Sequence, residues 1–293
     1  MFSSLLIRVA PVIFVLLWAT GYVGAKYSTA DAEPFTFLAI RFAFTFAILF
    51  PFVILVLKPA NVDRAQVMHS VLIGCLMQAL YLGGIFYAVD RGMAAGISAL
   101  VVALQPFFTA VLAMIFIGER LSFLKVAFFC SALCGVMLVL FPDFDFAKAI
   151  PGITVETMTA ALVGTIAISI GAVYQKRCVK SLNLWVSTTA QFAGAAVFTG
   201  LCAVLFENMD ITWSRQVVLS LAWLIFVLSI GAVGLLMYLI RQGNTSSVAS
   251  LFFLVPVVAM FMSWVLFDEQ LVAMQFVGSA IVVASVALAT RIE

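Results

Sequence analysis

Three side chains near the N-terminus have the types and the spacing to bind a flat solute. Trp18, Tyr22 and Lys26 recur every four residues, so on an α-helix they form one stripe about 12 Å long. Such a stripe could stack a planar molecule and end on a cation. The alternative is an aromatic–lysine belt at a membrane surface. We favour the belt for Lys26, because lysine side chains readily snorkel, and the binding role for Trp18 and Tyr22.

A second polar pair lies further along the chain. Gln78 and Tyr81 are three residues apart and therefore share one face of a helix. An amide without a partner in lipid costs several kcal/mol, so Gln78 must face protein or water. A hydrogen bond between two helices, worth about 0.6 kcal/mol, explains Gln78 as well as a contact with a ligand does, and both explanations stay open.

Two prolines interrupt long apolar runs. Pro106 follows Gln105 and cannot donate a hydrogen bond to the carbonyl four residues back, that of Val102. The free carbonyl and the Gln105 amide then lie close together. Pro256 has the same effect on the carbonyl of Phe252. Many membrane helices contain a kinking proline without functional consequence, but a symmetric pair favours a central hinge or cavity, with Pro106 and Pro256 as the hinges.

Two further polar residues complete the candidate set. Tyr238 would supply an aromatic ring from the second half of the chain, although packing at the membrane surface explains it slightly better. Arg41 lies about two turns into an apolar run, where a cation is costly unless it is paired or hydrated. It either pairs with Glu33 or lines an outer vestibule, and we favour the structural role. The candidate substrate-binding residues are Trp18, Tyr22, Gln78, Tyr81, Gln105, Tyr238 and Phe252.

The composition places these residues in a membrane protein. Hydrophobic residues make up 65% of the chain and charged residues 10%, against roughly 45–50% and about 25% in soluble domains. The mean hydropathy is +1.23. A helix needs about 20 apolar residues to cross a bilayer, and the sequence supplies such runs almost without interruption. We therefore expect an all-α, multi-pass membrane protein.

Apolar runs and polar breaks divide the chain into ten predicted transmembrane helices. The five of the first half are 9–27, 34–57, 66–89, 94–117 and 123–141. The five of the second half are 157–175, 184–206, 217–239, 246–267 and 272–290. The stretch 142–156, with three acids and two prolines, is the predicted linker between the halves.

The two halves repeat each other at an offset of 150 residues. Arg91, Pro106, Glu119 and Leu121 recur as Arg241, Pro256, Glu269 and Leu271. One transmembrane domain, 1–293, would then consist of two five-helix repeats, 1–143 and 151–293. Because each repeat has an odd number of helices, the second must be inverted relative to the first, an arrangement typical of transporters.

Charge sets the expected orientation. With cytoplasmic termini and ten helices, ten of the 15 Lys and Arg residues fall on the cytoplasmic side, as the positive-inside rule requires. All acidic residues fall at the ends of the predicted helices or in loops, so no carboxylate is placed to relay protons inside the membrane. The pattern favours a facilitator that runs solutes down their gradient; a proton-coupled antiporter is the alternative.

Other chemistries find little support. The net charge of +2 predicts no nucleic-acid partner. The chain has one histidine, His69, too few for an H-E-x-x-H metal site, and the Cys130 and Cys134 pair fits small core residues better than metal ligands. Ser98 and His69 lie at opposite membrane faces in this topology, so an intramembrane enzyme is only a distant alternative. We expect no enzymatic activity, no metal and no cofactor.

Several motifs together resemble the drug/metabolite transporter superfamily in its EamA-type ten-helix form. Trp18-Ala-Thr-Gly-Tyr22-Val-Gly-Ala-Lys26 is similar to the pattern of the first helix, although Ala19 stands where the family commonly has glycine. Pro34 with Arg41-Phe42 is similar to the second helix. The fourth and ninth helices of the family are matched by Leu104-Gln-Pro106 with Gly118-Glu119-Arg-Leu121, and by the copy with Pro256 and Glu269-Gln-Leu271.

The resemblance implies a carrier of small molecules. The chain looks most like the bacterial exporters of aromatic amino acids and methyl viologen. It implies alternating-access export of small amphipathic metabolites, aromatic amino acids first, with cationic drugs as a further class. The expected setting is the bacterial inner membrane with both termini cytoplasmic, lipid as the surrounding partner, and a monomer as the working unit.

Overall fold

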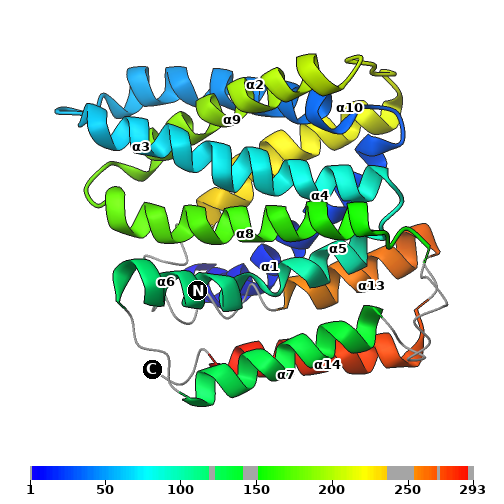
Figure 1. Ribbon diagram of the computed structural model, residues 1–293. Coiled ribbons are helices and arrows are strands. Elements are labelled where there is room, and N and C mark those ends of the chain that lie inside the picture. Colours follow the sequence, from blue (N-terminus) through cyan, green and yellow to red (C-terminus); the bar gives the residue numbers. More distant parts are fainter. Residues whose placement is uncertain (1, 119–122, 141–150, 236–253, 269–270, 290–293) are drawn as a thin grey trace.

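Helices make up the architecture of this protein (Figure 1). The computed structural model describes residues 2–118, 123–140, 151–235, 254–268 and 271–289. The helices of the first half are α1 (Phe2–Thr29), α2 (Pro34–Pro51), η1 (Phe52–Leu57), α3 (Arg64–Gly74), η2 (Cys75–Leu80), α4 (Tyr81–Asp90), α5 (Ala95–Val102), α6 (Gln105–Ile117) and α7 (Phe123–Leu140). Those of the second half are α8 (Val155–Cys178), α9 (Leu184–Phe206), α10 (Arg215–Ala222), η3 (Trp223–Ala232), α13 (Val255–Phe267) and α14 (Ala273–Ala289).

Each predicted transmembrane helix overlaps at least one described helix. Within the described ranges, seven helices are long and apolar enough to cross a membrane, and three shorter apolar helices accompany them. The chain is therefore an all-α membrane protein. The end of the eighth predicted helix, the first part of the ninth and most of the linker between the halves fall on 236–253 and 141–150, outside the described residues.

Irregular helix geometry appears at equivalent places in the two halves. The helices η1, η2 and η3 are π-helices, a form that is rare and often marks functional sites; η2 overlaps η3 at the 150-residue offset. The helices α6 and α13 begin and end at that same offset. Gly118 and Asp268, which terminate them, both adopt left-handed backbone conformations with φ of 76° and 51°. These correspondences support an internal duplication.

Helices that correspond at the offset pack against each other. The pair α2 and α9 lies at one side of the bundle and the pair α7 and α14 at the other (Figure 1). The backbone N–H groups of Phe35 and Thr36, at the start of α2, donate to the carboxylate of Glu207, just after the end of α9, at 2.8 and 2.7 Å. The two helices therefore run antiparallel, which supports an inverted repeat.

Glycines allow close approach at two other helix contacts. A Cβ atom added to Gly74 in α3 would overlap the carbonyl oxygen of Gln191 in α9. A Cβ atom on Gly164 in α8 would lie 2.8 Å from the carbonyl oxygen of Tyr81. Close backbone approach through small residues is the usual way in which membrane helices associate, and here it fixes Tyr81 against α8.

Loops from the two halves hold each other at both ends of the bundle. At the end expected to be outside, Glu207 binds the start of α2, and the carboxylate of Glu33 accepts hydrogen bonds from the N–H groups of Asn208 and Asp210 at 3.3 and 2.8 Å. We call this reciprocal arrangement the carboxylate clasp. Ala32 and Ile211 add an antiparallel β-bridge beside it.

At the opposite end, Gln66 makes a corresponding arrangement, the amide clasp. Its Oε1 accepts hydrogen bonds from the N–H groups of 180–182 at 3.1–3.2 Å. Its Nε2 donates to Asp63 at 2.8 Å and to Ser181 Oγ at 2.9 Å. The bond from Gln66, with a further one from the N–H of Ala65, holds the pKa of the Asp63 carboxyl below its usual range. Both clasps join the first half to the second.

Candidate substrate-binding site

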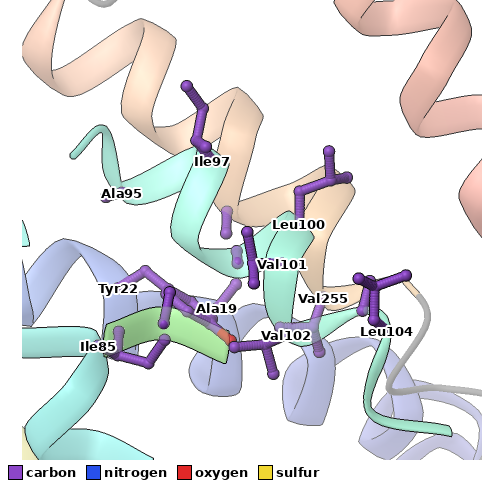
Figure 2. Packing of buried hydrophobic residues seen from close by; sticks show 14 of the residues in the cluster. Ala19, Tyr22, Ile85, Ala95, Ile97, Leu100, Val101, Val102, Leu104 and Val255 are labelled. Carbon is purple, nitrogen blue, oxygen red and sulfur yellow. The ribbon is translucent and has the colours of Figure 1, made fainter. Parts of the chain in front are cut away.

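Two predicted binding residues meet inside the bundle. Tyr22 of α1 and Tyr81 at the start of α4 are 6% and 8% exposed, and their hydroxyl oxygens lie 3.3 Å apart. Figure 2 shows Tyr22 and Ala19 of α1 in one packed cluster with Val101 and Val102 of α5. A buried pair of hydroxyl groups in apolar surroundings is a polar point at which a ligand could be oriented.

The other residues of the first-helix stripe also face protein. Trp18 is partly buried against the same cluster, and its ring lies 5.3 Å from that of Phe14. The Lys26 ammonium lies 5.9 Å from the centre of the Phe267 ring at the end of α13, within the range of a cation–π contact. Lys26 thus links the first and second halves. A role in an aromatic–lysine belt at the membrane surface would not require this contact.

Arg41 is a buried charged residue on α2, which packs against the helix that begins at Tyr81. It is 4% exposed, and its Nη2 donates to Ser229 Oγ in η3 at 3.2 Å. The guanidinium carbon lies 5.6 Å from the centre of the Phe42 ring. The expected pairing with Glu33 is wrong, because the Glu33 carboxylate is occupied by backbone N–H groups of the carboxylate clasp.

The two glutamine candidates lie at irregular points of their helices. Gln78 is half-buried within η2, three residues before Tyr81. Gln105 is half-buried and begins α6 directly after the turn at Ala103 and Leu104. Ser169 of α8 donates its hydroxyl to the Gln105 backbone carbonyl at 3.2 Å. The structure thus places Gln105 at a contact between the two halves.

The predicted hinges occupy matched positions. Pro106 and Pro256 are each the second residue of a helix, α6 and α13. Before Pro106 the transmembrane segment is interrupted rather than merely kinked, since α5 ends at Val102 and α6 starts at Gln105. The interruption is larger than the single lost hydrogen bond that we expected. Tyr238 and Phe252, the remaining candidates, lie outside the described residues.

Sequence reasoning did not select Ser229 or the π-helices. Serines in membrane helices commonly bond to their own backbone, so nothing in the sequence separates Ser229 from the others. Arg41 did carry a signal, its depth in an apolar helix, but its partner lies 188 residues away and is defined only by the tertiary fold.

Two other features bear on ligands. A cavity of about 250 Å³ lies beside the amide clasp, lined by residues of the 59–63 and 181–186 segments, and includes none of the candidate residues. No group of three or more His, Cys, Asp and Glu side chains suited to a metal ion occurs among the residues that the structure describes.

Comparison with known proteins places this architecture in context. A family model described as "EamA-like transporter family" matches the chain twice, over residues 5–141 and 156–291. A protein of Escherichia coli (strain K12) named "Probable amino-acid metabolite efflux pump" is 27% identical over 285 residues, covering 94% of this chain and 91% of that protein.

Further relatives and a solved structure agree with this match. The Salmonella typhimurium protein of the same name is 26% identical over 286 residues, covering 92% of this chain and 90% of its own. An "Uncharacterized inner membrane transporter YedA" of E. coli (strain K12) is 23% identical over 278 residues, covering 94% and 87%. A crystal structure with 20% identity superposes at a TM-score of 0.67 over 98% of both chains, and so shares the fold.

Proposed function

The chain belongs to the EamA-like transporter family, and from this premise we propose that it exports small amphipathic metabolites, with aromatic amino acids as the first candidates. It is a multi-pass membrane transporter and not an enzyme. The names of two relatives, each a probable amino-acid metabolite efflux pump, support amino acids as cargo. The name of a third supports the inner membrane as its location.

One observation carries the site: in both halves, buried polar side chains lie at irregular helix segments. Tyr81 directly follows the π-helix η2, and Ser229 lies within the π-helix η3. Transporters commonly form their substrate sites from discontinuous helices at the interface between repeats. Trp18, Tyr22, Gln78, Tyr81 and Gln105 would then contact the solute, with aromatic faces for stacking and amides and hydroxyls for orientation.

The proposed mechanism is alternating access. The repeats 1–143 and 151–293 would rock about Pro106 and Pro256, opening the site to one side at a time. The carboxylate clasp and the amide clasp, which join the halves at opposite ends, would open in turn. The proposal includes both termini on the cytoplasmic side and a monomer as the working unit.

We further propose that transport is uncoupled. The carboxylates of the described residues, Glu33 and Glu207 among them, lie at helix ends and in loops. A carboxylate within the membrane is the usual proton carrier. The described parts of the membrane helices have no carboxylate away from their ends, which favours uncoupled, downhill transport. Proton-coupled antiport is the alternative outcome of the test.

Flux of radiolabelled phenylalanine and threonine into proteoliposomes, with and without an imposed pH gradient, tests the function. We expect downhill phenylalanine flux that is independent of the gradient and is competed by other aromatic solutes. Accumulation against a gradient only when a pH difference is present would replace facilitation by antiport. Flux of neither amino acid would contradict the proposed cargo.

A further inference from the structure

Arg41 is a buried cation for which the described residues supply no anion. It is the eighth residue of α2, about 10 Å along the helix from its start. Its side chain is 4% exposed, and its Nε has no hydrogen-bond partner in the described part of the chain. The groups that do approach it are the hydroxyl of Ser229 and the ring of Phe42. Both are neutral.

A guanidinium in such surroundings is expensive to bury. Charged groups inside membranes are tolerated when they pair with one another or face a solute pathway, and an unpaired one points to function. The Arg41 position satisfies one donor through Ser229 and leaves Nε available. Since a carboxylate binds arginine through two parallel hydrogen bonds, the missing partner has the chemistry of a carboxylate.

Arg41 also lies at the right place to meet a solute. It lies on α2, which packs against α4, the helix that begins at Tyr81, and Tyr81 belongs to the Tyr22–Tyr81 hydroxyl pair, where the two oxygens are 3.3 Å apart. A flat solute held by the aromatic residues of that cluster would therefore have a cation within reach. An amino acid offers both parts, an apolar side chain and a carboxylate.

We propose that Arg41 binds the carboxylate of the transported solute, with Ser229 orienting the guanidinium. The inference rests on the proposed function and narrows it: the cargo carries a carboxylate, so amino acids are transported and purely cationic drugs are not. The buried guanidinium is neutralised when the solute is bound in the closed site and becomes hydrated when the site opens.

The test compares phenylalanine with phenethylamine, which lacks the carboxylate but keeps the ring and the amine. Flux is measured in proteoliposomes for the wild type, Arg41→Gln, Arg41→Lys and the control Arg91→Gln, whose side chain is 55% exposed. We expect wild type and R91Q to carry phenylalanine at least ten-fold faster than phenethylamine. R41Q should lose at least ten-fold in phenylalanine flux, and R41K should lose less, because it keeps the charge but not the planar fork.

Melting temperatures, with and without each solute, separate binding from structure. Because R41Q removes a buried charge, its melting temperature should equal or exceed that of the wild type, whereas an arginine with only a structural role would leave it lower. Phenylalanine should raise the melting temperature of the wild type and not that of R41Q, and phenethylamine should raise neither.

The failures of the two proposals are distinguishable. Equal wild-type flux of phenylalanine and phenethylamine, or R41Q flux within two-fold of wild type, would overturn the carboxylate site and leave an exporter. If neither solute crosses the membrane, the proposal that the protein exports these solutes is refuted. The melting temperatures then decide whether Arg41 binds a carboxylate. If sodium chloride raises the melting temperature as much as phenylalanine does, the site binds inorganic anions and the inference is contradicted. The inference is also contradicted if phenylalanine does not raise the melting temperature at all.

Discussion

Single side chains near Tyr22 show which parts of a binding site a sequence reveals. Regular spacing marked Trp18 and Tyr22 as one stripe, and Gln78 with Tyr81 as one face, and the structure brings Tyr22 and Tyr81 together. Arg41 stood out by its depth in an apolar helix, but the partner assigned to it was wrong. Spacing reports neighbours on one helix, whereas the Arg41–Ser229 contact joins helices far apart in sequence.

The tyrosine pair makes a prediction at this scale. Tyr22→Phe or Tyr81→Phe leaves one buried hydroxyl without its partner, at a cost of about 1 kcal/mol. Because removing both partners leaves no orphaned group, the double variant should be closer to the wild type in unfolding free energy than the sum of the single losses. Denaturant unfolding in detergent measures all three variants. Strictly additive losses would show that the two hydroxyls are not coupled.

The helices were the most predictable elements, and their irregularities the least. Long apolar runs in the sequence predicted the apolar helices that the described residues form, because a helix needs about 20 apolar residues to cross a bilayer. The π-helices η1–η3 were not anticipated, since no residue type specifies the extra residue in such a turn. The proline positions predicted a disturbance before Pro106, but they did not predict its extent, a turn that separates α5 from α6.

The crossing of α3 and α9 gives a prediction at the element scale. Gly74→Ala places a Cβ on the Gln191 carbonyl oxygen and should cost about 1–3 kcal/mol of stability, as other overpacked sites do. Gly200→Ala in α9 is the matched control, because its Cβ would meet nothing within 4 Å. Thermal unfolding should show a lower melting temperature for G74A only. Equal melting temperatures would mean that the helices separate at no cost.

For the molecule as a whole, the duplication was readable from the sequence because charged, proline and glycine residues recur at one offset. The double match of the family model over 5–141 and 156–291 agrees with two copies. The antiparallel course of α2 and α9, shown by the Glu207 hydrogen bonds, supports the proposed inversion. The two clasps could not be predicted, since each depends on loops from different halves meeting in space.

The central claim is that the two halves must separate at one end for a solute to pass. Ala32 and Ile211 pair across an antiparallel bridge between the halves, where Cα atoms lie about 4.5–5.5 Å apart, a separation that suits a disulfide. The variant Ala32→Cys with Ile211→Cys would be built in a background in which the five native cysteines are replaced by serine. The two single-cysteine variants are the controls.

The decisive measurement is phenylalanine flux through this double variant in proteoliposomes, first oxidised and then reduced. The alternating-access account predicts that oxidation reduces flux to less than a tenth of the cysteine-free value and that reduction restores it, while the single-cysteine controls respond to neither treatment. Undiminished flux through the oxidised, fully cross-linked protein would contradict the account, because solute would then cross without separation of the halves at the carboxylate clasp.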